Sequence, residues 1–231
     1  MINSRQQLVT KAELSPTPQD VAISNITDRS FTASWTTTFP ASGFIKLMPQ
    51  GKSERIILDD RDKDKSSQNK RTVHYATVDS LTSAETYKFV IGGDNSQFDQ
   101  NGSPFSVRIA PALSSAPQSD IASGIILSEN GQAAEGIIVY IQIPGGQLAS
   151  ALSDGSGRWV APLSVVRTEN GDSWLNYDLS ATVYAVKADG GPAGTADAIL
   201  TTAIDKPVPP IKLGNSYDFR KSREPISSAV D

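Results

Sequence analysis

The chain contains one histidine, His74, and no cysteine, so few side chains are available for acid–base, nucleophilic or metal chemistry. Binuclear phosphoesterases and zinc hydrolases need several histidines around their metals. A serine triad needs a histidine beside a nucleophile, and no G-x-S-x-G motif marks one. His74 shares strand parity with Ala76 and Val78, which predicts a histidine at the margin of a sheet face. We expect no catalytic residue, no cofactor and no metal, and hence no enzyme.

A pair of carboxylates acting as in a glycosidase stays open, because Asp and Glu are plentiful and their separation in space is unknown from sequence. The sequence singles out no particular pair of carboxylates, so a glycosidase ranks last among the functions considered.

Calcium is an alternative for the acidic run DDRDKDK, through Asp60, Asp62 and Asp64, because Ca²⁺ prefers several carboxylate oxygens. An EF-hand would need Gly and Glu where this chain has Lys65 and Arg71. Three cations among the four aspartates leave the run only one charge negative. We favour a solvated turn.

A second loop, residues 92–104, groups polar side chains near Phe98. These are Asp94, Asn95, Asp99 and Asn101. The loop would either bind calcium or present Phe98 to a sugar or protein, but we favour a long hairpin with side-chain turns. Trp159 or Trp174, with Tyr177, is a candidate aromatic platform for a glycan or protein, although tryptophans in sandwiches more often pack in the core.

The net charge of −4 and the scattered basic residues argue against a nucleic-acid partner. No apolar run is long enough to span a membrane, and the first residues lack the apolar centre of a signal peptide. Either the protein is not exported, or a leader or membrane anchor lies outside this chain.

Short runs rich in Val, Ile, Thr, Tyr and Phe recur along all 231 residues, separated by Gly, Pro, Asn and Asp. This pattern predicts an all-β chain of two immunoglobulin-like β-sandwich domains in tandem, with extended tails. The linker PALSSAPQS separates them. We expect an N-terminal tail (1–18), a first sandwich (19–111), a linker (112–119), a second sandwich (120–214) and a C-terminal tail (215–231). From residue 163 to 174 the pattern fits either a long loop or one helical turn.

In SFTASWTT, the alternation places Phe31, Ala33 and Trp35 on one face and the polar residues on the other. Leu81 is followed six residues later by Tyr87. This combination resembles a fibronectin type III domain with its strand tryptophan and tyrosine corner. Ser83 and Ala84 depart from the Pro and Gly usual in that family's corner. Trp35 should then be a core residue.

The second half combines a glycine-bounded strand pair with a Ser-Asp-Gly turn before an aromatic. The residues are Gly124, Gly131, Gly136, Val139, Ser153, Asp154, Gly155 and Trp159. This arrangement resembles carboxypeptidase regulatory-like or collagen-adhesin B-repeat domains. Some relatives carry a Lys to Asn crosslink formed from a first-strand lysine. Residues 120–163 contain no lysine, so we expect no such crosslink.

The tandem resembles bacterial surface proteins, which implies an extracellular or cell-surface location. We expect a structural or adhesion protein with protein–protein contacts, self-assembling by strand addition from its tails to sheet edges. The alternative is the accessory carbohydrate- or protein-binding region of a secreted hydrolase. Fold alone does not decide between them.

Overall fold

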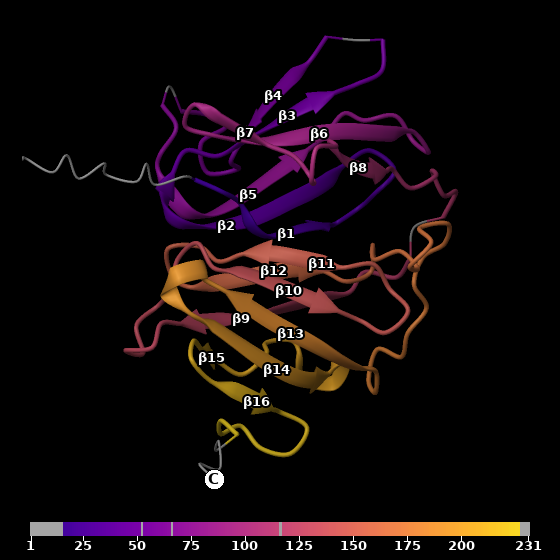
Figure 1. The fold of residues 1–231 in the computed structure, drawn as a ribbon. Coiled ribbons are helices and arrows are strands. Elements are labelled where there is room, and N and C mark those ends of the chain that lie inside the picture. Colours follow the sequence, from indigo (N-terminus) through magenta and orange to yellow (C-terminus); the bar gives the residue numbers. More distant parts are fainter. Residues whose placement is uncertain (1–15, 52, 66, 116, 227–231) are drawn as a thin grey trace, which may run out of the picture.

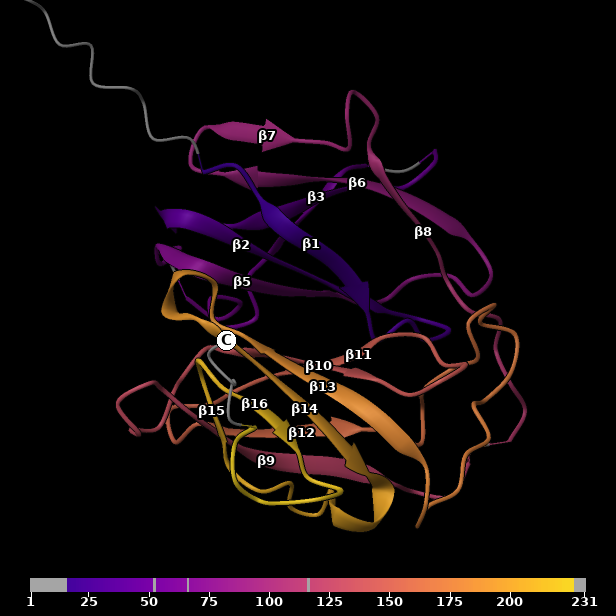
Figure 2. The ribbon, with the colours of Figure 1, turned by 60° about the horizontal axis from the view of Figure 1, so that its bottom comes forward.

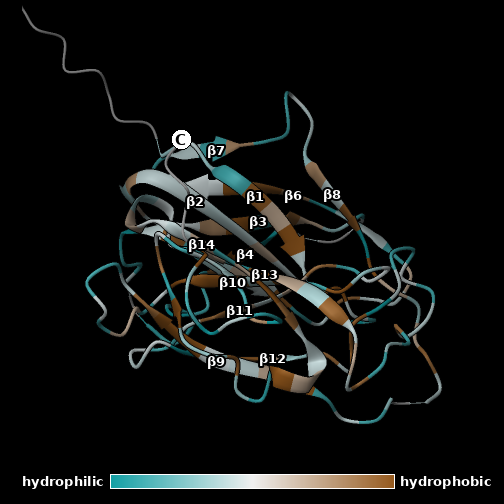
Figure 3. Ribbon diagram, turned by 90° about the horizontal axis from the view of Figure 1, so that it is seen from below, coloured by the Kyte–Doolittle hydropathy of each residue, from teal (hydrophilic) through white to brown (hydrophobic). Residues whose placement is uncertain are grey.

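The computed structural model describes residues 16–226 except residues 52, 66 and 116. The chain is almost entirely β-structure, folded as two immunoglobulin-like sandwiches that follow one another along the sequence (Figure 1). The predicted all-β class with two such sandwiches is confirmed. Figure 3 shows hydrophobic residues mainly along the strands and hydrophilic residues mainly in the connecting loops.

The first sandwich has two antiparallel sheets. One has the order β1-β2-β5, formed by β1 (Gln19–Ser24), β2 (Phe31–Ala41) and β5 (Arg71–Val78). The other has the order β4-β3-β6-β7, with β8 also paired to β6. Its strands are β3 (Phe44–Met48), β4 (Arg55–Leu58), β6 (Thr86–Gly93), β7 (Ser96–Phe98) and β8 (Phe105–Arg108).

The core of the first sandwich confirms the fibronectin-type, immunoglobulin-like character of this fold. Trp35 is buried in one apolar cluster with Leu81 and Tyr87. The Tyr87 hydroxyl accepts a hydrogen bond from the backbone N–H of Thr82 at 2.9 Å, which ties the corner before β6 to the strand. Ala84 has φ 60°, so an alanine adopts here the left-handed conformation that favours glycine.

The second sandwich has one sheet of order β12-β9-β15 and one of order β11-β10-β13-β14-β16. Its strands are β9 (Ile121–Leu127), β10 (Ile138–Gln142), β11 (Ala149–Leu152), β12 (Arg158–Pro162), β13 (Val183–Asp189), β14 (Thr195–Thr201), β15 (Ile211–Lys212) and β16 (Ser216–Asp218). Two short 3₁₀ turns, η1 (Gly191–Ala193) and η2 (Thr202–Ile204), lie at the ends of β14. Trp159 and Tyr184 are the largest fully buried side chains of its core.

The second sandwich extends beyond residue 214, where the sequence predicted a tail. Strand β16 pairs in parallel with β14. Tyr217 and Phe219 stack at 4.9 Å and are buried in the core, so hydrocarbon burial holds this segment to its own sheet. Residues 1–15 of the predicted N-terminal tail and residues 227–231 of the C-terminal tail lie outside the described part of the chain.

The two sandwiches stack as four layers of sheet, with β1-β2-β5 facing the sheet that contains β10 and β11 (Figure 2). The turn η1 at the end of β13 reaches β2 and β5 of the first sandwich. The candidate functional site lies between the packed faces of these two central sheets.

Candidate functional site

The outer face of β2 and β5 carries hydroxyl groups, yet most of it is buried. We call it the hydroxyl face and define it by Thr32, Ser34 and Thr36 on β2 and by Tyr75 and Thr77 on β5. Ser34 is 0% exposed. A polar strand face normally contacts water, so the burial of this one identifies an interface between the two sandwiches.

An apolar patch fills the middle of this interface. It joins Val73 and Tyr75 of β5 to Ile138 and Tyr140 of β10. Leu148, Leu152 and Ala22 pack against its sides. Burial of this hydrocarbon is the main source of attraction between the domains.

The polar groups of the interface are paired across it. Ser34 Oγ and the Tyr140 hydroxyl share a hydrogen bond of 2.8 Å. Ser24 and Ser150 share one of 2.6 Å between their hydroxyls. Burial raises the pKa of Tyr140 to about 12, so its phenol keeps its proton at neutral pH.

Asn25 extends this pairing to the backbone of β11. Its side-chain N–H donates to Ser150 O at 3.0 Å, and its side-chain oxygen accepts from Ser150 N at 2.9 Å. A reciprocal amide pair of this kind defines the register of the loop after β1 against β11.

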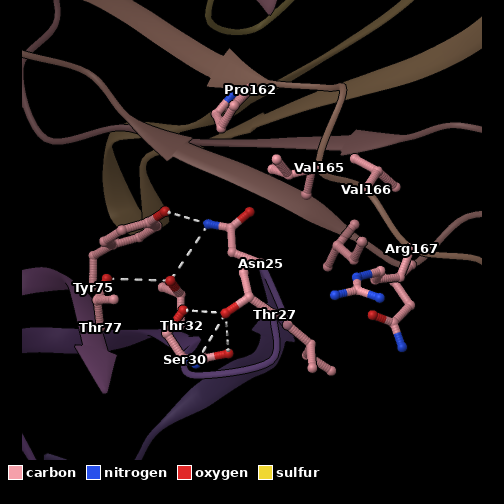
Figure 4. A pocket seen from close by; sticks show the side chains of 14 residues that line it. Asn25, Thr27, Ser30, Thr32, Tyr75, Thr77, Pro162, Val165, Val166 and Arg167 are labelled. Atoms are coloured by element: carbon pink, nitrogen blue, oxygen red, sulfur yellow. Dashed lines mark hydrogen bonds between the residues drawn. The ribbon is translucent and has the colours of Figure 1, made fainter. Parts of the chain in front are cut away.

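A cavity of about 210 Å³ opens beside this pair, between the domains (Figure 4). Apolar side chains form much of its wall, among them Ile26, Leu148, Pro162, Val165 and Val166. Hydroxyl groups of the first sandwich line the opposite side, where Thr27 and Ser30 share a hydrogen bond of 2.7 Å. The cavity is thus amphipathic.

Arg167 is the cation of this cavity, and its guanidinium points toward the interior in Figure 4. It is 1% exposed, and Nε and Nη1 have no hydrogen-bond partner within residues 16–226 as described. Burial lowers its pKa, and the charge of Asp28, which acts in the opposite direction, has the smaller effect. A buried guanidinium without a carboxylate partner is costly, and an anion that enters the cavity would offset that cost.

Trp174 holds the guanidinium from one side. The Arg167 guanidinium carbon lies 3.8 Å from the centre of the Trp174 ring, within the range of a cation–π contact. The Trp174 indole N–H donates to the backbone oxygen of Ser115, in the segment predicted as a linker. Isolated bridges, and no helical turn, organise the segment from residue 163 to 174.

His74 lies on β5, the edge strand of the sheet β1-β2-β5, and faces the first core on the side that it shares with Ala76 and Val78, as the strand parity predicted. It is 0% exposed and stacks on Trp35 with 5.0 Å between ring centres. Neither ring nitrogen has a partner among the described residues. Burial lowers its pKa to about 4, despite the opposing charge of Asp59, so His74 is neutral at physiological pH.

The acidic run is a turn with two buried, paired carboxylates and an exposed second half, so the expectation of a solvated turn holds for residues 63–65 but not for Asp59 and Asp62. Asp59 binds Arg61 through two contacts of 2.8 Å, and Asp62 binds Arg71 at 2.6 and 2.9 Å. Both aspartates are buried. Arg71 holds the pKa of Asp62 well below its usual range.

The remaining carboxylates of the two candidate calcium sites are either paired with other groups or exposed. Asp60 accepts from Thr77 N–H at 2.8 Å and pairs with Lys63, whereas Asp64 is exposed. Asp94 pairs with Lys70, and Asp99 accepts from Gly102 N–H in the loop at 92–104. The described residues contain no group of three or more His, Asp or Glu that could hold a metal.

The three aromatic residues of the predicted platform have separate roles in the structure. Trp159 is buried in the second core. Tyr177 packs partly against that core and donates its hydroxyl proton to Asp120 at 2.7 Å. Trp174 covers Arg167.

Sequence reasoning missed Arg167 and the hydroxyl face. The available signals were an arginine directly after Val165 and Val166, and a strand whose polar side carries only hydroxyls. The hydroxyl pattern does not identify its partners, because Ser34 pairs with Tyr140 and Ser24 with Ser150, each more than 100 residues away along the chain. In the described part of the chain, no helix is both long and apolar enough to cross a membrane.

Comparisons with known proteins add little to this description. No protein-family model and no curated protein sequence matches the chain. Among solved structures, the chain is similar to a crystal structure of chicken CNTN1 FN1-FN3 domains, at 14% identity and a TM-score of 0.29. The match covers 85% of this chain and 66% of that chain. So low a TM-score carries no functional weight, and the fold assignment rests on strand order and core.

Proposed function

We propose that the chain is a non-enzymatic structural or adhesion protein, extracellular or on a cell surface, whose two sandwiches act as one rigid unit. The interface of Val73, Tyr75, Ile138 and Tyr140 is the observation that supports this proposal. Linked domains move independently by default unless a substantial apolar contact joins them. Here the contact is buried and its central hydroxyls are paired.

The absence of enzymatic activity is part of the proposal. His74 is enclosed in the core and neutral, so it is not available to a substrate. Asp59 and Asp62 of the acidic run are bound to arginines. These contacts support a structural role for the histidine and aspartate side chains that were candidates for catalysis or metal binding.

Replacing Ile138 by Asp tests the rigid unit. A carboxylate at this interface costs about 3 kcal/mol or more if it stays buried, so we expect the domains to separate. Calorimetry should then show two melting transitions in place of one, and small-angle scattering should give a larger radius of gyration.

The control is Ile199→Asp. Ile199 lies on the same face of the same sheet, on β14, but is exposed. It should leave both measurements unchanged. Separation in the control, or a single transition and unchanged radius for Ile138→Asp, would contradict the proposal.

We further propose that the chain self-assembles by adding a strand from its N-terminal segment to a sheet edge of a neighbouring copy. The C-terminal strand β16 already pairs within its own sheet and Tyr217 forms a bridge with Pro225, so we limit the C-terminal truncation to residues beyond 226. Sedimentation velocity should show assemblies for the full chain but not for a chain starting at Pro16. A chain lacking 227–231 is the control, and equal assembly of all three would refute the mechanism.

A further inference from the structure

None of the described residues that line the Arg167 cavity is acidic. Among the described residues no ion pair joins the Arg167 guanidinium to a carboxylate, and Asp28 acts on it only through its charge at longer range. Gln147, which lines the same cavity, is neutral, and its side-chain oxygen also has no hydrogen-bond partner within the described part of the chain. Charged side chains are rarely buried alone, because desolvation costs more than a cation–π contact returns. A bound anion is the simplest way to complete this site.

The charge of the cavity favours a monoanion. Arg167 is the one cation among the residues that line it. Phosphoryl groups usually require several cations or a run of backbone N–H donors, whereas one planar guanidinium matches a carboxylate. The class of anion is therefore a carboxylate.

The rest of the cavity favours a hydrocarbon group attached to that carboxylate. Leu148, Pro162, Val165 and Val166 present apolar surface around the guanidinium. A cavity of about 210 Å³ is larger than the roughly 150 Å³ engineered cavity that holds benzene. The space fits a compact aromatic or aliphatic acid of about that size.

The site is also preorganised and reachable. Trp174 fixes the guanidinium plane, and the Ser115 carbonyl fixes the indole, so little side-chain freedom is left to lose on binding. Val165 is 38% exposed while it lines the cavity, which places it at the rim. A ligand can enter past this side chain.

We propose that this cavity between the domains binds a small organic monoanion, a carboxylate joined to a compact apolar group, with Arg167 as the residue that binds the carboxylate. This role goes beyond the structural function proposed above. It makes the domain junction a ligand site that needs both sandwiches.

Titration calorimetry of the full chain with phenylacetate and hexanoate tests the proposal. We expect saturable binding of at least one acid, and none of phenylacetamide, hexanamide, chloride or phosphate at the same concentrations. Arg167→Met should weaken the binding roughly 10- to 100-fold, the effect of losing a charged hydrogen bond. Without ligand, Arg167→Met should not lower the melting temperature, because it removes an unpaired buried charge.

A rim variant separates binding from folding. Val165→Trp should block entry and weaken binding, while Val160→Trp, on an exposed part of β12 outside the cavity, should not. Equal binding of an acid and its amide would overturn the proposal. So would undiminished binding by Arg167→Met, a fall in its melting temperature, binding of chloride or phosphate alone, or no saturable binding of either acid.

Discussion

Arg71→Met should lower the free energy of unfolding by about 3 to 5 kcal/mol at neutral pH. Asp62 is 1% exposed and receives two hydrogen bonds from Arg71, so the variant strands a buried carboxylate. The Asn69 donors and a distant Lys65 would remain, and neither replaces a bidentate guanidinium. Urea denaturation at pH 7 measures the loss.

The matched control is Arg55→Met. Arg55 lies 3.8 Å from Asp79, and both side chains are well exposed. Exposed pairs contribute little, so the control should cost less than about 1 kcal/mol. Equal losses in the two variants would mean that burial of Asp62 has no energetic consequence.

The cost of Arg71→Met should also depend on pH in a defined direction. Pairing depresses the pKa of Asp62 in the folded chain, so its stabilising effect is complete above the ordinary value of 3.8. That effect is lost as the pH falls through the folded-state pKa, where the carboxyl becomes neutral. The difference between wild type and variant should therefore shrink below about pH 4, and a constant difference down to pH 2 would contradict the ion-pair explanation.

Local patterns were sufficient to predict the all-β class and the two sandwiches, but not the pairing of β16 with β14. The alternation at Phe31, Ala33 and Trp35 identifies an inward face, because only one face of a sandwich strand meets its own core. Leu81 and Tyr87 add the corner that positions β6. The residues of each such pattern lie within a few positions of one another, so the pattern can be recognised from the sequence alone.

The interface and the cavity depend on contacts that no local pattern carries. A hydroxyl side chain such as that of Ser34 can form hydrogen bonds with water or with another hydroxyl group equally well. The alternation of residues along the strand therefore does not show whether its polar face is exposed to water or covered by another domain. Asp62 similarly looked solvated beside lysines, and its actual partner, Arg71, begins the next strand. Arg167 lies in a loop without periodicity, and its burial depends on the stacking of the domains together with Trp174 of its own segment.

Trp35→Ala should destabilise the protein by about 3 to 5 kcal/mol, the usual cost of removing a buried aromatic side chain. Trp35 is among the largest fully buried side chains, and it covers His74 in the core. Truncation would leave a cavity against an imidazole that already lacks hydrogen-bond partners among the described residues. Thermal denaturation monitored by circular dichroism measures the loss.

Phe39→Ala is the control, because Phe39 lies on the same strand but is 41% exposed. Its effect should stay within about 0.5 kcal/mol. The variants at Trp35 and Arg167 should have opposite effects. Truncating Trp35 should lower stability and leave the carboxylate affinity of the folded protein unchanged. Truncating Arg167 should lower that affinity and leave stability unchanged. If Trp35→Ala is as stable as wild type, Trp35 is not a core residue, and its role in the first sandwich must be reassigned.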